Sequence, residues 1–151
     1  MKITQGTIGR IFVVHLDDGD EIVESITRAA REHEVASGLV WLIGAARDGK
    51  LVVGPRKTEI PPERWFMPFE EGRELVGIGT LFPKDGEPSL HLHAATGRGE
   101  ITLTGCVQPG SRTFLVGEAV ILEIAGTGAV RRPDPSGRFH LLSLPDEGAK
   151  P

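Results

Sequence analysis

Apolar and charged residues alternate with a helical period in one segment near the N-terminus. Between residues 21 and 35, Ile22, Ile26 and Ala30 recur every four positions, and charged side chains occupy positions between them. This spacing predicts an amphipathic helix with one apolar face. Asp20 lies just before it and suits the N-cap position, and a Ser-Gly pair after residue 36 is typical of a helix end. We therefore predict a helix over about residues 21–35.

The rest of the chain carries short apolar runs that are rich in β-branched residues and separated by turn-forming residues, a pattern that predicts strands. Asp48-Gly49 is a typical two-residue hairpin turn, so we expect two strands to meet there. Residues 126–137 are rich in proline and glycine and predict a connection without regular structure. The predicted strands are residues 10–16, 39–46, 51–53, 65–69, 75–82, 89–95, 100–107, 113–124 and 139–144.

One helix among many strands predicts a domain of the α+β class. The length of 151 residues suits one domain, which we assign to residues 1–144, and we expect residues 145–151 to form a flexible C-terminal tail. The chain has no run of about 20 apolar residues, so we predict no membrane span. The N-terminal residues lack the features of a signal peptide. The single cysteine, Cys106, cannot form an intrachain disulfide, so we expect a cytoplasmic location.

The charge balance argues against a general nucleic-acid-binding protein. The chain has 17 Lys and Arg residues against 21 Asp and Glu residues, which gives a net charge of −4. The basic residues are scattered, with Arg56-Lys57 and Arg131-Arg132 as the densest pairs, whereas nonspecific binding needs clustered positive charge. Six Phe, two Trp and no Tyr residues leave no evident platform for stacking bases. The charge balance does not exclude a specific DNA site on a multimer.

A predicted hairpin contains two histidines and the cysteine. Successive side chains of a strand point to opposite faces, so His91 and His93 share one face. If residues 97–100 form a four-residue loop, His91 lies opposite Cys106 on the next strand. Two imidazoles and one thiol in a single patch suit Zn²⁺, with a fourth coordination position open. The pattern therefore predicts a metal site made of His91, His93 and Cys106.

Each of these residues also has a simpler interpretation. A His-x-His pair on a strand is commonly solvated or structural, a lone cysteine is commonly a small buried hydrophobic residue, and another loop length would move Cys106 to a diagonal position. Glu118 could supply a carboxylate to the same patch, although a polar position at a sheet edge explains it as well. The other histidines are isolated and are predicted to be structural or exposed: His15, His33 and His140.

The order of these features resembles the plants-and-prokaryotes-conserved (PPC) domain in its stand-alone prokaryotic form. The resemblance covers about residues 10–144. It implies an α+β fold with a largely antiparallel sheet and one main helix, assembly as a homotrimer, and a metal, usually zinc, on the histidines of two neighbouring strands. It rests on the Gly-Asp-Glu start of the helix, on Ser37–Ala46, on His91-Leu92-His93, on Thr104-Gly105-Cys106 and on Gly117-Glu118-Ala119.

Two features depart from the family pattern. Cys106 stands where the family has its third histidine, so a site of three histidines becomes two histidines and a cysteine, which zinc also accepts. The AT-hook that carries the DNA contact in plant members is missing, because Arg131-Arg132-Pro133 lacks its central glycine.

The resemblance implies two kinds of function. The first is a homotrimeric metal-binding protein that acts by association, with DNA-linked regulation as the setting, since stand-alone members are often labelled DNA-binding by analogy with plant proteins. The alternative is a zinc-dependent enzyme acting on a small molecule, because acetolactate decarboxylase shares the fold and binds zinc through histidines. Fold analogy alone does not establish an activity. The sequence also offers no general acid or base beyond the predicted ligands, so we favour the first function.

Overall fold

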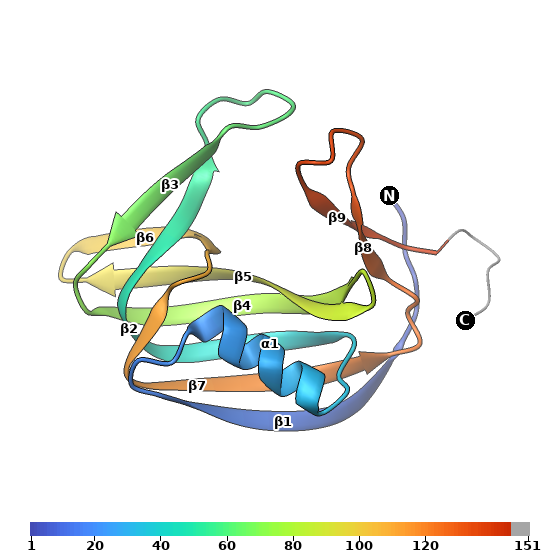
Figure 1. Cartoon of the computed structure of the whole chain (residues 1–151), viewed down its shortest axis with the longest axis horizontal. Helices are drawn as coiled ribbons and strands as arrows, with labels where there is room; N and C mark the ends of the chain where they lie inside the picture. The colour runs from blue at the N-terminus through green and yellow to red at the C-terminus, as the bar shows by residue number, and fades with distance from the viewer. Residues whose placement is uncertain (146–151) are drawn as a thin grey trace.

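The computed structural model describes residues 1–145, most of which form a strongly bent β-sheet with a helix against one face (Figure 1). The sheet has the order β1-β7-β2-β6-β5-β4-β8-β9, with β3 paired to β2 and a further pairing between β2 and β4. Among the described residues, only β4 and β8 pair in parallel. The elements are β1 Thr7–Asp17, α1 Ile22–Glu32, β2 Gly38–Pro55, β3 Arg64–Phe69, β4 Arg73–Lys84, β5 Glu87–Arg98, β6 Ile101–Val107, β7 Arg112–Ala125, β8 Val130–Pro133 and β9 His140–Ser143.

This arrangement confirms the predicted α+β class with one main helix and a largely antiparallel sheet. Of the predicted C-terminal tail, only Pro145 is described; residues 146–151 lie outside the described residues. Within the described part of the chain, no helix is long and apolar enough to cross a membrane.

The helix is shorter than predicted and is capped by a different residue. The carboxylate of Glu21, and not that of Asp20, accepts a hydrogen bond from the backbone N–H of Glu24. Asp20 instead accepts a hydrogen bond from the N–H of Asp17, because it belongs to the tight turn that ends β1. At the other end the helix stops at Glu32, and Glu34 adopts a left-handed backbone conformation with φ of 55°.

The hairpin predicted at Asp48-Gly49 is wrong, because β2 continues through it from Gly38 to Pro55. The first half of β2 lies between β7 and β4, and the second half lies between β3 and β6. β2 changes its partner strands at Asp48-Gly49. The register of its pairing with β7 is irregular just before this dipeptide, between Ala46 and Asp48. A Cβ atom on Gly49 would lie 2.6 Å from Ser111 Oγ, so glycine is required here by close packing and not by a turn.

A strand also forms where a connection without regular structure was predicted. Within residues 126–137, β8 forms an antiparallel pair with β9, and Arg131 of β8 also pairs with Lys84 at the end of β4. The hairpin of β8 and β9 stands out from the main sheet, as does the hairpin of β2 and β3 on the other side (Figure 1). We call these two hairpins the two arms.

The helix covers one face of the sheet and creates the core there. Alternate residues of the strands point toward α1, and Gly77 and Gly79 of β4 lie among them, which lets the neighbouring β5 side chains pack closely. Burial of this apolar surface is the main stabilising contribution. The core consists of Leu16, Ile22, Ile26, Ala30, Val35, Val40, Leu42, Ala46, Leu51, Phe69, Leu75, Leu81, Leu92, Ala94, Val107, Ala119 and Ile121.

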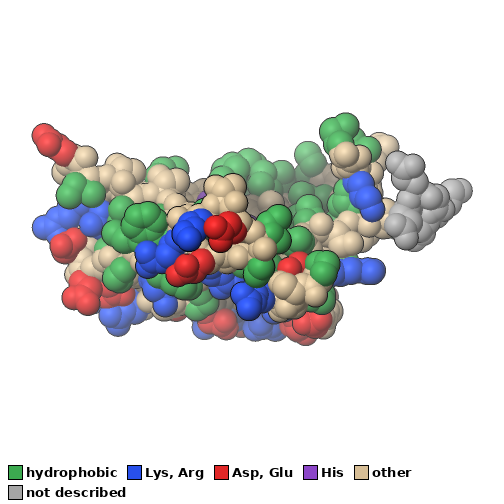
Figure 2. Space-filling model, turned by 90° about the horizontal axis from the view of Figure 1, so that it is seen from above, with side chains coloured by type: hydrophobic (Ala, Val, Ile, Leu, Met, Phe, Trp, Pro, Cys, Tyr) green, Lys and Arg blue, Asp and Glu red, His purple; other side chains and the backbone are tan. Residues whose placement is uncertain are grey.

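The opposite face of the sheet carries exposed apolar side chains. In register across β1, β2 and β4 lie Val13, Trp41 and Ile78, which are 80%, 44% and 53% exposed. In Figure 2, charged side chains gather along one long edge of the molecule and hydrophobic ones along the opposite edge. We call the exposed apolar set on this face the outer face: Val13, Trp41, Ile43, Val76 and Ile78.

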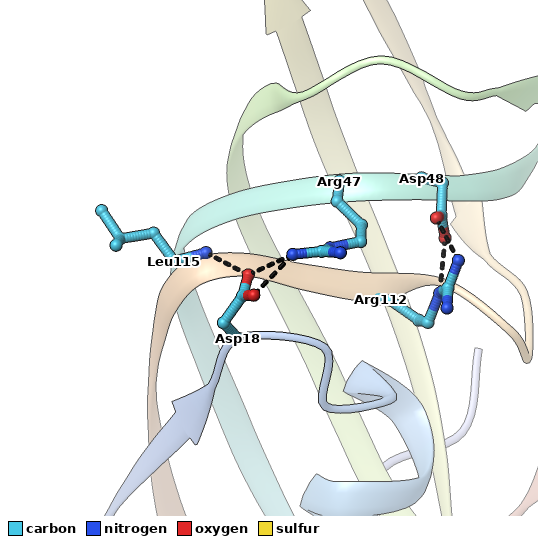
Figure 3. A network of polar contacts seen from close by, with 5 residues as sticks. All are labelled: Asp18, Arg47, Asp48, Arg112 and Leu115. Atoms are coloured by element: carbon cyan, nitrogen blue, oxygen red, sulfur yellow. Dashed lines mark hydrogen bonds and ion pairs between the residues drawn. The ribbon is translucent and has the colours of Figure 1, made fainter.

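Two ion pairs lie near the loop after β1 (Figure 3). One joins this loop to β2, and the other joins β2 to β7. Asp18 accepts hydrogen bonds from Arg47 of β2 and from the backbone N–H of Leu115, and Asp48 accepts from Arg112 of β7. Leu115 has a positive φ of 62° at a bulge in β7, where the register with β2 shifts. The backbone hydrogen bond from Leu115, followed by that from Arg47, holds the pKa of Asp18 below its usual value.

Candidate metal centre

The alternation of β5 places its histidines and its hydrophobic residues on opposite faces. Leu92 and Ala94 are buried in the core on the helix side, whereas His91 and His93 are exposed on the outer side. The prediction that the two histidines share a face is therefore confirmed. His93 is the cross-strand neighbour of Ile78, so the histidines extend the outer face toward β6.

The register of the hairpin differs from the prediction by two residues. Gly99 and Glu100 form a two-residue turn in place of the predicted four-residue loop, so Arg98 pairs with Ile101. In consequence His93, and not His91, lies directly opposite Cys106. A shift of two residues changes the partners but preserves the faces, because side chains alternate with a period of two. Cys106 thus still points to the side of both histidines.

The two histidines and the cysteine form one cluster. One ligand atom from each of His91, His93 and Cys106 lies within 4.8 Å of the others, and the two Nε2 atoms of the histidines are 3.2 Å apart. Two nitrogen ligands on a tetrahedral zinc ion, with bonds of about 2.0 Å, are separated by about 3.3 Å. The nitrogen–nitrogen distance and the donor types of the cluster therefore both suit such an ion.

A glycine beside the cysteine permits this arrangement. Gly105 of β6 lies so close to β2 that a Cβ atom would be 2.2 Å from the carbonyl oxygen of Val52. Val52 is also the Cα partner of Cys106, so the close contact of β6 with β2 determines where the thiol lies. We expect any larger side chain at residue 105 to move Cys106.

The surroundings affect the protonation of the ligands in opposite directions. Partial desolvation of its ring by neighbouring groups, followed by the charges of His93 and Arg131, lowers the pKa of His91, which favours the neutral imidazole that a metal requires. Burial raises the pKa of the Cys106 thiol, although a hydrogen bond with Gln108 and the charges of Arg64 and Arg131 act against it. Without a metal, the cysteine is therefore a neutral thiol near pH 7.

The other candidate residues lie away from the cluster. Glu118 is on β7, which is separated from β5 by β2 and β4, so it supplies no carboxylate to these ligands. His15 is exposed beside Asp17, and the His33 ring lies against Phe12 at 5.1 Å between centroids. His140 begins β9. Within residues 1–145, no Asp or Glu side chain joins the cluster of three.

Sequence reasoning missed one residue next to the cluster, Arg131. The sequence shows it only as part of a scattered basic pair in a predicted connection, but the structure places it on β8. Its Nη2 donates hydrogen bonds to the carbonyl oxygen and to Oγ1 of Thr80, the Cα partner of His91. No local pattern in the sequence signals this contact, because it depends on the parallel pairing of β8 with β4.

Comparison with known proteins agrees with this architecture. The model of the Plants and Prokaryotes Conserved domain, abbreviated PCC or PPC, matches residues 3–125. The chain belongs to this family. The resemblance of the sequence to the PPC domain is thereby confirmed. Among curated proteins, no sequence matches this PPC-domain chain.

Solved structures share the fold at low sequence identity. The metal-containing protein of Archaeoglobus fulgidus is 24% identical, with a TM-score of 0.83 over 95% of this chain and 99% of its own. A PPC protein of Pyrococcus horikoshii is also 24% identical, with a TM-score of 0.82 over 96% and 99%. A candidate DNA-binding protein of Bacteroides thetaiotaomicron is 21% identical, with a TM-score of 0.76 over 92% and 97%. These similarities establish the fold alone.

Proposed function

We propose that this PPC-domain protein binds one zinc ion per chain through His91, His93 and Cys106. The observation that carries the proposal is the convergence of two imidazoles and a thiol, with ligand atoms within 4.8 Å of one another. Nitrogen and sulfur donors of this kind select zinc over magnesium or calcium, which prefer oxygen. The name of the A. fulgidus protein, which describes it as metal-containing, is consistent with this function.

The cluster supports binding in preference to catalysis. Within the described residues, no Asp or Glu side chain belongs to the cluster of three candidate ligands. The cluster therefore has no carboxylate that could act as a general acid or base. The single free cysteine, Cys106, is consistent with the reducing cytoplasm that we expect for this protein. We therefore favour a metal-binding protein over the zinc-dependent enzyme that the sequence left as the alternative.

We also propose that the protein assembles as a homotrimer through its outer face. Apolar side chains on this face are strongly exposed in one chain, among them Val13, Val76 and Ile43 at 80%, 60% and 54%. Contiguous apolar surface of this kind is usually covered by another protein surface. We assign a second copy of this chain to it, and the number three rests on the resemblance to stand-alone PPC proteins.

Direct DNA binding receives little support from the charges of the chain. The net charge is −4, and half of the arginines in the described strands are paired with acids, among them Arg10–Glu123, Arg47–Asp18 and Arg112–Asp48. The B. thetaiotaomicron relative is named as a candidate DNA-binding protein. For this chain, we propose that any role at DNA depends on association with another protein.

The zinc proposal is tested by elemental analysis of protein without an affinity tag after dialysis against excess Zn²⁺ and then buffer. We expect one zinc ion per chain in the wild type and a loss of most of the metal in His93→Ala. The control is His15→Ala, an exposed histidine of β1 outside the cluster, which should retain the metal. Circular dichroism should be unchanged in both variants, because the core-facing Leu92 and Ala94 are untouched. A wild type that retains no stoichiometric zinc contradicts the proposal.

A further inference from the structure

Arg131 is a buried arginine without an acidic partner among the described residues. Its side chain lies on β8 with 9% of the residue exposed, and its Nε makes no hydrogen bond. Nη2 donates to Thr80 Oγ1 at 2.9 Å and to the Thr80 carbonyl oxygen at 3.2 Å, and the guanidinium carbon is 5.9 Å from the centre of the Phe82 ring. All three contacts are with neutral groups, whereas buried charges are normally paired.

The other described arginines are either exposed or paired with an acid. Of the described residues, Arg73 is the second buried arginine, and it forms an ion pair with Glu71 at 3.3 Å. Arginines that have no acidic partner in the described structure are otherwise exposed to water, as Arg132 is next to Arg131. Arg131 is therefore buried without a carboxylate partner in the part of the chain that the structure describes, although the chain has more acidic than basic residues.

The guanidinium group lies beside the histidine–cysteine cluster. Thr80, which anchors it, is directly opposite His91 in the pairing of β4 with β5, and directly paired residues have Cβ atoms about 5 Å apart on the same face. The charge of Arg131 reaches the cluster, since it contributes to the lowered pKa of His91 and acts on the Cys106 thiol.

A second cation approaches the same place from the other arm. Arg64 of β3 also acts on the Cys106 thiol, and its Nη2 contacts the carbonyl oxygen of Arg138 in the connection between β8 and β9. The charges that influence His91 and Cys106 therefore come from His93 and from two arginines, all basic groups. Neither Arg64 nor Arg131 forms an ion pair with a described acid, so each arm carries an arginine without an acidic partner on this side of the molecule.

We propose that Arg131 binds the carboxylate of a small organic anion that lies against the cluster of His91, His93 and Cys106. The inference rests on the proposed function in one respect, since a metal on the cluster would add to the attraction of the anion. The guanidinium group pairs with a planar carboxylate through parallel N–H groups, and this pairing is strong where water is largely excluded. Arg64 contributes the more exposed, long-range part of the attraction.

Acetate is the probe, followed by the backbone N–H signal of Thr80, the residue that Arg131 contacts and that every variant keeps, in ¹⁵N NMR spectra of metal-free and zinc-loaded protein. We expect a saturable shift in both forms, with tighter binding in the zinc-loaded form. Arg131→Gln should weaken acetate binding at least tenfold, and Arg64→Gln by about two- to threefold. The matched control is Arg132→Gln, the exposed neighbour, which should bind as the wild type does.

A second variant covers the case that Arg131→Gln fails to fold. Arg131→Lys keeps the charge and should still bind acetate several-fold more weakly than the wild type, because it lacks the planar pair of donors. Acetamide, the neutral analogue, should cause no shift.

Two results would overturn the proposal: no acetate shift in the wild type, or equal affinity in the wild type and Arg131→Gln. Failure of the zinc proposal is distinguishable. Arg131-dependent acetate binding in a protein that takes up no zinc would leave the anion site intact. Stoichiometric zinc with no dependence of acetate binding on Arg131 would refute only the anion site.

Discussion

Cys106 is a candidate ligand whose proton affects how the proposed metal site responds to pH. Burial raises the pKa of its thiol, and the thiolate is the form that binds zinc, so metal binding must displace a proton. His91 is already neutral near pH 7, since partial desolvation of its ring lowers its pKa. Proton loss from the cysteine therefore contributes to the pH dependence of metal affinity near neutrality.

We predict that Cys106→His keeps or strengthens zinc binding and makes it less dependent on pH. Wild-type affinity should fall about tenfold per pH unit between pH 8 and pH 7, as expected when one thiol must lose a proton. The histidine variant should change much less over this range. Competition with a chromophoric chelator measures both affinities, and Cys106→Ala serves as the control that lacks a third ligand. Loss of zinc from Cys106→His would contradict the prediction.

Glu123 of β7 is a second residue with a strongly altered pKa. Its carboxylate accepts hydrogen bonds from the Arg10 side chain and from the Arg10 backbone N–H, and these lower its pKa from 4.5 to about 2. A carboxyl group with a lower pKa in the folded state stabilises the fold above its unfolded pKa. This stabilisation is lost as the pH falls from about 4.5 through about 2.

We predict that Glu123→Gln lowers the free energy of unfolding by about 1–2 kcal/mol at pH 7. The difference from the wild type should shrink as the pH falls below 4.5 and should vanish near pH 2. Denaturant unfolding at a series of pH values measures it. Glu118→Gln is the control on the same strand, since Glu118 is exposed and its described surroundings contain no ion pair. A difference that persists undiminished at pH 2 would exclude this explanation.

At the scale of elements, the contact between β6 and β2 positions the cysteine. Leu51 and Val52 of β2 pair with Val107 and Cys106 of β6, and Gly105 is the residue that allows the strands to approach. The second half of β2 reaches this position only because the strand does not turn at Asp48-Gly49. The position of Cys106, one of the candidate ligands, is thus determined by a long strand that changes partners along its length.

We predict that Gly105→Ala destabilises the protein by about 1–3 kcal/mol, as overpacking typically does. The new Cβ would meet backbone atoms of Val52, the nearest at 2.2 Å, and backbone cannot move aside as a side chain can. Zinc affinity should fall as well. Gly97→Ala is the matched control on the same hairpin, because the nearest atom to its Cβ, Thr102 Oγ1, is 3.6 Å away. Thermal unfolding measures the stability of both variants, and zinc titration measures their zinc affinity. Equal stability of Gly105→Ala and Gly97→Ala would refute the packing argument.

At the scale of the whole molecule, the two faces of the sheet have different roles. One face is covered by α1 and makes the core, whereas the outer face leaves Trp41, Ile43 and Ile78 exposed beside the histidines. Contact between copies on this face would bring neighbouring subunits close to the candidate metal centre. Assembly and ligand binding are therefore expected to affect one another.

We predict that light scattering of the wild type at micromolar concentration gives the mass of three chains, and that Ile43→Lys lowers this mass. The lysine would lie opposite Glu118, its Cα partner on β7, so a single chain should tolerate it while an apolar interface would not. Ile101→Lys is the control, since Ile101 is also exposed but alternates to the other face of β6. A wild type that is a clean monomer would contradict the trimer.

We also predict weak, salt-sensitive binding to random DNA duplexes at most. With a net charge of −4, few phosphates can be neutralised by this surface. A gel-shift titration at physiological salt measures the affinity, and tight binding independent of DNA sequence would refute the prediction.

The sequence alone determined the features that depend on local periodicity. The period of four in Ile22, Ile26 and Ala30 predicts the buried face of α1, and the period of two places His91 and His93 on one side of β5. Both patterns follow from backbone geometry within a single element, so no distant contact is needed to predict them. For the same reason, the sequence predicts that His91, His93 and Cys106 share one face although the predicted loop has the wrong length.

The tertiary structure decided everything that depends on which strands meet. Asp48-Gly49 has the composition of a hairpin turn, but pairing with β3 and β6 draws β2 straight through it. The register that sets His93 opposite Cys106 depends on the turn at residues 99–100. Arg131 comes to the cluster only because β8 returns to the end of β4, nearly 50 residues along the chain. Such contacts are selected by the burial and hydrogen bonding of the whole sheet, which no local window of sequence contains.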